Sequence, residues 1–158
     1  MVKEAVTVII PAYNEVEGLA AVLPPLQRSL ETDGIPHEII IVNDGSTDGT
    51  ETFAAAQGLR VLTHVKNRGY GAALKTGILA ASHERLVTID ADGTYPPEAI
   101  PALLNELDHA EMVVGARRIS RWTGPWSRKM ARWALGALAN YLVGLRIPDV
   151  NSGFRTFQ

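Results

Sequence analysis

Two carboxylates separated by a single residue, Asp90 and Asp92, are the side chains of this sequence best suited to binding a metal ion. They follow directly after the apolar run 86–89 (LVTI), which has the composition of a buried strand. Mg²⁺ and Mn²⁺ take one or two carboxylates and complete their shell with oxygens of a substrate diphosphate. The pair therefore indicates a site for a divalent cation. A solvated turn in which one aspartate caps the following helix would give the same sequence.

Two further polar clusters also follow apolar runs. Residues 11–15 (PAYNE) offer Tyr13, whose ring could lie beside a nucleotide base, and Glu15, which could reach a ribose hydroxyl. Residues 43–50 (NDGSTDGT) offer Asp44, which could accept a hydrogen bond from a base or a ribose. The simpler alternatives are that Tyr13 is ordinary amphipathic packing and that the second cluster only caps a helix.

The elements that must position these clusters alternate between strand and helix. Apolar, β-branched runs predict strands at 5–10, 38–42, 60–65, 85–89 and 111–115. Helical patterns lie between and after them, at about 14–30, 50–57, 71–82, 97–107 and 125–145. Asn14 and Glu17 form a capping-box pattern that predicts the start of the first helix, and Pro24-Pro25 should kink or split it.

Strands that are apolar throughout and separated by helices predict an α/β fold, with a mostly parallel sheet covered by helices on both faces. Ligands of such sheets bind outside the carboxyl ends of the strands. The clusters at 11–15, 43–46 and 90–92 each follow a strand, so we expect them to converge on one edge of the sheet.

Composition excludes several classes of protein. A chain of 158 residues with 46% hydrophobic and 20% charged residues fits one globular domain spanning residues 1–158. The absence of cysteine excludes disulfide scaffolds, thiolate zinc sites and cysteine nucleophiles.

The glycine-rich segment 67–71 (NRGYG) matches neither the P-loop nor the dinucleotide-binding pattern. We find no signal-peptide pattern and no uncharged apolar stretch of about 18 residues, so no spanning helix is expected.

The formal net charge of −2 conceals two parts of opposite charge. Residues 1–111 contain 7 Lys/Arg and 16 Asp/Glu, whereas residues 112–158 contain 8 Lys/Arg and 1 Asp/Glu. The acidic part is therefore expected to hold a cation, and the basic part to meet an anion or an anionic membrane. A helix around 126–145 that combines basic residues with tryptophan could lie in a membrane interface or could be an ordinary core helix.

Six segments, in this order, resemble the family 2 glycosyltransferases: VIIPAYNE (8–15), IIIVNDGSTDGT (39–50), NRGYGAALKTGI (67–78), TIDADGTYPPE (88–98), VVGARR (113–118) and NSGFR (151–155). Within the family they are most similar to the polyprenyl-phosphate sugar transferases, the group that includes dolichyl-phosphate mannose synthase. The resemblance implies a GT-A-like fold with a Rossmann-like nucleotide-binding half. It also implies metal-dependent, inverting transfer of a sugar from a UDP- or GDP-sugar to a dolichyl or undecaprenyl phosphate.

Matching the motifs residue by residue implies a role for each part of the chain. The expected contacts to the nucleotide-sugar are Pro11, Tyr13, Glu15, Asp44 and Asp90. Asp92 and Asp90 would hold Mg²⁺ or Mn²⁺, and Thr94 stands where relatives often carry glutamine and could add one oxygen. Arg117 and Arg128 would clamp the lipid phosphate. Residues 1–111 would then bind donor and metal, and residues 112–158 would form a basic part that faces the acceptor and the membrane.

Transfer to a saccharide hydroxyl, in polysaccharide or glycolipid synthesis, is the main alternative. Such a transfer usually needs a carboxylate as general base. No Asp or Glu occurs from 112 to 148, which leaves Asp149 as the remaining candidate base. A lipid phosphate is already an anion near neutral pH, so this absence favours a phosphate acceptor.

Two further alternatives belong to classes of protein other than the glycosyltransferases. A nucleotidyltransferase would begin with a glycine-rich loop and a basic residue after its first strand, and residues 11–15 contain neither. Relatives continue beyond NSGFR, so we expect the chain to be truncated at its C-terminus, and it could be a non-catalytic nucleotide-sugar-binding fragment. The expected location is cytoplasmic, peripheral at the cytoplasmic face of a membrane, with no nucleic acid as partner.

Overall fold

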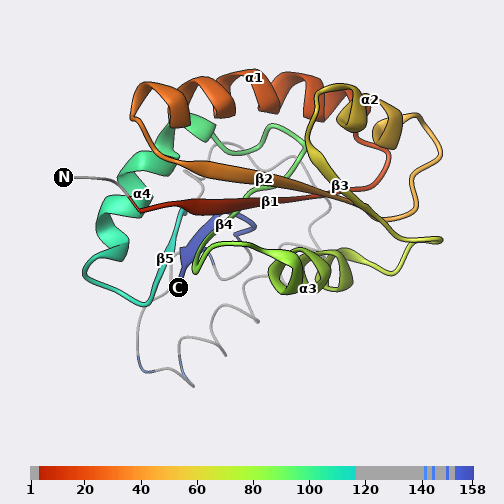
Figure 1. The fold of residues 1–158 in the computed structure, drawn as a ribbon. Coiled ribbons are helices and arrows are strands. Elements are labelled where there is room, and N and C mark those ends of the chain that lie inside the picture. Colours follow the sequence, from red (N-terminus) through yellow and green to blue (C-terminus); the bar gives the residue numbers. More distant parts are fainter. Residues whose placement is uncertain (1–3, 117–140, 142–143, 145–148, 150–151) are drawn as a thin grey trace.

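A single six-stranded sheet organises the chain in its computed structural model, which describes residues 4–116, 141, 144, 149 and 152–158. The strand order is β3-β2-β1-β4-β6-β5, and Figure 1 shows helices on both sides of the sheet. The strands are β1 (Val6–Ala12), β2 (His37–Asn43), β3 (Arg60–Thr63), β4 (Arg85–Thr88), β5 (Met112–Val114) and β6 (Arg155–Phe157). The helices are α1 (Val16–Thr32), α2 (Thr50–Ala56), α3 (Tyr70–Ala80) and α4 (Ile100–Leu107), the last preceded by the 3₁₀ turn η1 (Pro97–Ala99).

The predicted α/β fold with a mostly parallel sheet is confirmed. β1 pairs in parallel with β2 and β4, and β2 pairs in parallel with β3. The sequence did not predict β6, a strand of three residues that runs antiparallel between β4 and β5. Thr156 faces Val87 on one side and Val113 on the other, so β5 joins the sheet only through β6.

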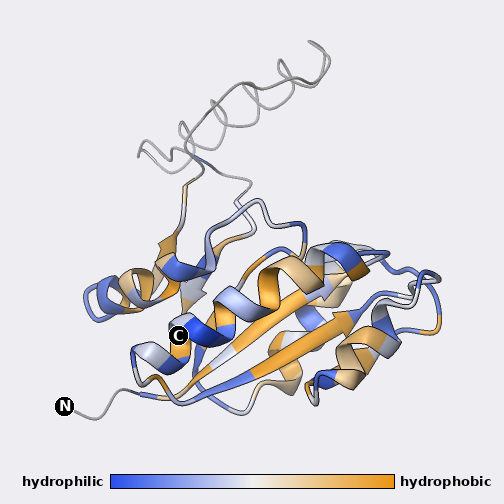
Figure 2. Ribbon diagram, turned by 90° about the horizontal axis from the view of Figure 1, so that it is seen from above, coloured by the Kyte–Doolittle hydropathy of each residue, from blue (hydrophilic) through white to orange (hydrophobic). Residues whose placement is uncertain are grey.

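Alternating side chains of the central strands enter two separate packing layers. Val8 and Ile10 of β1 belong to the larger cluster, which also contains the buried stripe of α1 and residues of α4. Ile9 joins Ile40 and Val42 in a smaller cluster packed by α3. The strands are therefore covered on both faces, as parallel strands usually are. The hydropathy colouring in Figure 2 shows them as a mostly hydrophobic layer at the centre of the molecule.

β1 continues through Pro11, although the sequence predicts that this strand ends before the proline. The carbonyl of Ile9 accepts a hydrogen bond from Ile89 on the β4 side, whereas the carbonyl of Ala12 accepts one from Asp44 on the β2 side. Because successive residues of a strand alternate sides, Pro11 faces the β4 side. The next rung of this ladder would run from the N–H of residue 11 to the carbonyl of Ile89. Because proline has no N–H, the β4 pairing ends at Thr88, opposite Ile9.

α1 runs through Pro24 and Pro25 without being split, contrary to one of the two expected outcomes. Each proline removes one N–H donor, so the carbonyls of Ala20 and Ala21, four residues earlier, lose their helical partners. Both alanines are exposed, and water can hydrogen-bond their carbonyls. The buried stripe on the opposite side of α1 runs from Leu19 to Leu30 and spans the two prolines.

The helix expected at 125–145 lies outside the described residues, apart from Tyr141 and Gly144. Tyr141 is helical and 84% exposed. Among the helices that the structure describes, none combines the length and the apolar character needed to cross a bilayer.

α3 approaches β1 closely at Gly77. A Cβ built there would overlap the side chain of Ile9, whereas one at Gly71 in the same helix would meet nothing within 4 Å. We expect Gly77→Ala to destabilise the fold by about 1–3 kcal/mol through overpacking, despite the better helix propensity of alanine. Gly71→Ala is the matched control and should be neutral or stabilising. Urea unfolding measures both variants, and equal stabilities would contradict this account of the α3–β1 contact.

Candidate functional site

The three polar clusters that the sequence predicts to converge do meet at one cavity. It has a volume of about 380 Å³ and lies at the carboxyl ends of β1, β2 and β4. Its lining residues are Pro11, Ala12, Tyr13, Glu15, Asp44, Asn67, Gly69, Tyr70, Ala73, Asp90, Ala91 and Asp92. The order β2-β1-β4 explains the convergence, since these three strands are neighbours and parallel.

The loop after β1 is held by the loop after β2 and does not form the predicted capping box. Asn14 has a left-handed backbone (φ 54°), and its side-chain oxygen accepts a hydrogen bond from the Thr47 amide. The amide at the start of α1, that of Val16, instead donates to Asp48 across the two loops, at 3.3 Å. Asp48 also accepts the amide hydrogen bond of Thr50, at 3.0 Å, so one carboxylate serves the first turns of two helices.

Glu15 carries a raised pKa among these loops. Burial contributes most to the shift, followed by the negative charges of Asp92 and Asp48. Glu15 is therefore close enough to Asp92 and to Asp48 for each to repel its negative charge. A cation bound in the cavity would relieve that repulsion, because an opposite charge favours the ionised carboxylate.

Asp90 is held from two sides by groups that the sequence did not single out. The hydroxyl of Tyr70, the first residue of α3, donates to its carboxylate at 2.8 Å. Burial, followed by the hydrogen bond to Asp90, raises the pKa of the Tyr70 hydroxyl above its ordinary value. On the other side, a Cβ at Gly153 would overlap both carboxylate oxygens of Asp90. Any residue larger than glycine at 153 would therefore displace the Asp90 carboxylate.

Asp92 and Thr94 lie in the exposed turn that follows. The amide of Thr94 donates to the Asp92 carboxylate at 2.9 Å, and Gly93 between them has a φ of 72°. Asp92 reaches the cavity, whereas Thr94 is not among its lining residues. Of the three residues expected to bind the metal, Asp90 and Asp92 therefore line the cavity and Thr94 does not.

These residues fit a divalent cation that shares its shell with a diphosphate. Across the part of the chain that the structure describes, no group of three or more His, Cys, Asp or Glu is arranged to hold a metal alone. Magnesium sites commonly use one or two protein carboxylates and take further oxygens from phosphate groups. Asp90 and Asp92 meet that requirement, and the nearby negative charge of Glu15 favours a cation.

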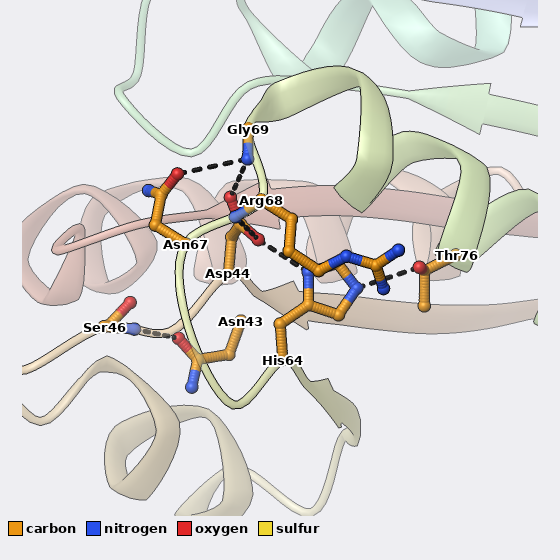
Figure 3. Close-up of polar contacts among 8 residues, drawn as sticks. All are labelled: Asn43, Asp44, Ser46, His64, Asn67, Arg68, Gly69 and Thr76. Carbon is orange, nitrogen blue, oxygen red and sulfur yellow. Dashed lines mark hydrogen bonds and ion pairs between the residues drawn. The ribbon is translucent and has the colours of Figure 1, made fainter.

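Asp44 is a buried residue of the cavity wall, and three groups of the protein hydrogen-bond its carboxylate (Figure 3). The amides of Arg68 and Gly69 donate to it at 2.9 and 2.8 Å. His64 donates through Nδ1 at 2.6 Å. Burial by itself would raise the pKa of Asp44, but these hydrogen bonds outweigh it and hold the pKa below its usual range. Asp44 therefore shapes the cavity partly by holding the loop that contains Arg68 and Gly69.

The sequence analysis overlooked His64, which lies next to the end of β3 and is 7% exposed. Its Nε2 is 2.9 Å from the hydroxyl oxygen of Thr76 on α3. The rule that places functional groups beyond the carboxyl ends of strands also covers β3. The sequence predicts that strand at 60–65, which places His64 inside it, whereas β3 ends at Thr63 and leaves His64 just beyond its carboxyl end.

A second cavity of about 530 Å³ adjoins the first and shares Tyr70 and Asp90 with it. Its remaining lining residues are Leu74, Ile78, Thr88, Met112, Ser152, Gly153, Arg155 and Phe157. The clamp residues expected from the sequence, Arg117 and Arg128, lie outside the described residues. Asp149, the candidate base of the alternative reaction, is half-buried, and its carbonyl accepts a 3.4 Å hydrogen bond from Ser152.

The model of glycosyl transferase family 2 matches residues 7–157. An undecaprenyl-phosphate mannosyltransferase of Micrococcus luteus is 34% identical over 97% of this chain and 66% of its own length. A dolichyl-phosphate hexose transferase of Haloferax volcanii is 33% identical over 96% of this chain and 65% of its own length. The chain therefore spans just under two thirds of these two relatives.

Solved structures agree with the fold. Glucosyl-3-phosphoglycerate synthase of Mycobacterium tuberculosis, in complex with Mn²⁺ and UDP-glucose, superposes with a TM-score of 0.73 at 27% identity. That match covers 98% of this chain and 56% of the synthase. Mannosyl-3-phosphoglycerate synthase of Rubrobacter xylanophilus superposes with a TM-score of 0.78 at 20% identity, over 98% of this chain and 53% of that one. The second match supports the fold alone.

Acid unfolding tests the ionised state of Asp44. A carboxylate whose folded pKa is depressed stabilises the fold above its unfolded pKa of about 4, and this contribution is lost as the pH falls through the folded value. We expect Asp44→Asn to cost about 2 kcal/mol at pH 7, because three donors lose a charged acceptor. The difference from the parent protein should narrow as the pH falls below 4.

Urea unfolding at a series of pH values measures this difference in stability. Asp108→Asn is the control, because Asp108 forms an exposed ion pair with Arg85 and should contribute less than about 1 kcal/mol. A difference between Asp44→Asn and the parent protein that stayed constant from pH 7 to pH 2 would contradict an ionised Asp44.

Proposed function

The chain belongs to glycosyltransferase family 2, and we propose that it transfers a sugar from a nucleotide-diphospho-sugar to a polyprenyl phosphate. The observation that carries this proposal is the meeting of Asp90 and Asp92 with the 11–15 cluster at one cavity. The names of the relatives, which act on undecaprenyl and dolichyl phosphates, support the acceptor class.

The donor would lie in the cavity of about 380 Å³. Pro11, Tyr13 and Glu15 would contact its nucleoside, on the loop that Asp48 and Thr47 fix in place. Asp44, which also lines the cavity, would contact the donor as well, while its carboxylate holds the amides of Arg68 and Gly69. A site whose loops hydrogen-bond one another before the donor arrives pays less ordering entropy on binding.

Asp90 and Asp92 would hold Mg²⁺ or Mn²⁺ against the donor diphosphate. When bound, the ion neutralises charge on the departing nucleoside diphosphate. The M. tuberculosis synthase, a similar fold bound with Mn²⁺ and UDP-glucose, supports a divalent ion at this site, and Mn²⁺ is the first ion to test. Tyr70 keeps the Asp90 carboxylate turned toward the boundary between the two cavities.

The acceptor would approach Asp90 from the side of the second cavity, which combines apolar side chains with Arg155. Arg117 and Arg128 remain our proposed clamps for its phosphate. An acceptor oxygen would form a bond to the anomeric carbon as the bond from that carbon to the diphosphate breaks, with inversion of configuration. Orientation of the two substrates would supply much of the rate.

We further propose that residues 1–111 bind the donor and metal and that residues 112–158 face the acceptor. This division would be one of function within a shared sheet, since β5 and β6 pair into the sheet that β1 to β4 form. The excess of basic residues after 111 favours peripheral binding to an anionic membrane, on its cytoplasmic face.

Metal dependence tests the role of Asp92. We expect Asp92→Asn to lower sugar transfer at least 100-fold, on the order of 3 kcal/mol, because a ligand of the leaving-group ion is lost. The assay supplies UDP-glucose or GDP-mannose, undecaprenyl phosphate in detergent, and Mn²⁺. Glu106→Gln changes an exposed acid of α4 and should leave the rate unchanged. An active Asp92→Asn protein would contradict the metal assignment.

Asp149 separates the two acceptor classes. A phosphate acceptor needs no general base, so we expect Asp149→Asn to keep the rate of transfer to undecaprenyl phosphate within about threefold. Transfer to a saccharide hydroxyl would instead fall by about 100-fold or more without its base. A parent protein that binds a nucleotide-sugar with Mn²⁺ by calorimetry yet transfers to neither acceptor would favour the non-catalytic alternative.

A further inference from the structure

Asp44 and His64 form a buried pair at the wall of the donor cavity, which Asp44 lines and His64 does not (Figure 3). The two side chains are 3% and 7% exposed as residues, and His64 Nδ1 lies 2.6 Å from Asp44 Oδ1. An ionised carboxylate can only accept hydrogen bonds, so Nδ1 carries the proton of this contact. Thr76 fixes the other end of the ring, with its hydroxyl oxygen 2.9 Å from Nε2. The orientation of the imidazole is therefore determined on both sides.

The carboxylate of Asp44 in turn determines the path of the loop before α3. Its two oxygens accept the consecutive amides of Arg68 and Gly69, at 2.9 and 2.8 Å. Gly69 has a φ of 89°, and Asn67 adds a hydrogen bond to the same amide at 3.1 Å. Two neighbouring amides can point at one carboxylate only while the loop keeps this bend. A rotation of the carboxylate would release both.

The loop that Asp44 holds forms part of the donor cavity. Asn67, Gly69 and Tyr70 all line it. Tyr70 follows Gly69 directly, and its hydroxyl reaches Asp90 at 2.8 Å. A continuous series of contacts therefore leads from His64, beside the end of β3, to the carboxylate expected to hold the metal at the end of β4.

We propose that His64 is a positioning residue for the donor cavity: by orienting Asp44 it holds residues 67–70 in the conformation that binds the nucleotide-sugar. This inference rests on the proposed function and adds to it a residue that touches neither substrate nor metal. A histidine that served stability alone would change the free energy of unfolding and leave the affinity of the folded protein unchanged.

Three variants separate these two roles. His64→Leu removes the donor to Asp44, and His64→Asn places an amide N–H near the position of Nδ1. Thr7→Val is the matched control, because the Thr7 hydroxyl is buried and donates to Glu38 at the opposite end of β1. If His64→Leu does not fold, His64→Gln replaces it, since its longer side chain carries the amide toward Thr76.

Calorimetry with UDP and with GDP, in the presence of Mn²⁺, gives the first readout. We expect His64→Leu to weaken the nucleotide affinity about tenfold, the loss that a charge-assisted hydrogen bond implies. His64→Asn should restore the affinity to within about threefold. Thr7→Val should bind as the parent protein does, although it is less stable.

Hydrogen exchange of the Arg68 and Gly69 amides, followed by NMR without any ligand, gives the second readout. Both amides should exchange about tenfold faster in His64→Leu and remain protected in His64→Asn. Unchanged exchange in His64→Leu, or an affinity equal to that of the parent protein, would overturn the inference. A parent protein that binds neither nucleotide would contradict the proposed function instead, and the exchange rates would then decide whether His64 holds the loop.

Discussion

β1 pairs in parallel with β2 on one side and with β4 on the other, and this pairing sets the positions of the other parts of the site. β1 pairs with β2 over seven positions and with β4 over four, and its side chains are buried along its whole length. Since parallel strands end at the same edge, the clusters at 11–15, 43–50 and 90–92 lie together whatever the loops between them do. Burial on both faces makes this arrangement costly to disturb, because a shift of register by one residue would exchange side chains such as Ile9 and Ile10 between two different packing layers.

The loops at that edge are held mainly by one another. Asn14 binds Thr47, Asp48 binds Val16, and Asp44 binds the Arg68 and Gly69 amides, so each loop is closed by a residue of another. Two of the acceptors, Asp48 and Asp44, are carboxylates, and those of Glu15, Asp90 and Asp92 lie at the same edge, which is therefore rich in acidic groups. Such an edge suits a cation and the hydroxyl and amide donors of a nucleoside. It would repel a diphosphate that came without its metal.

The segment after 111 also reaches the site. Gly153 packs against the Asp90 carboxylate, its carbonyl accepts a hydrogen bond from Thr88, and its amide donates to the Tyr95 hydroxyl. β6 follows two residues later and completes the sheet between β4 and β5. Residues 152–158, the end of the basic segment, therefore form part of the acidic site. The donor and the acceptor would meet beside Asp90.

The amino-acid sequence alone predicts the strand–helix alternation, the parallel sheet, the edge at which the polar clusters gather and the family. It does so because apolar periodicity, the alternation of strands and helices, and the family motifs can all be recognised over short stretches of the chain. The folded structure was needed to find the partners of Asn14, the course of β1 through Pro11 and the insertion of β6. It was also needed to find the contacts of His64, Tyr70 and Gly153 around Asp44 and Asp90. Those features arise from contacts between residues 20 or more positions apart, such as Tyr70 with Asp90 and Asn14 with Thr47. No local pattern encodes them, because a side chain selects its hydrogen-bond partner among whatever groups the fold brings near it.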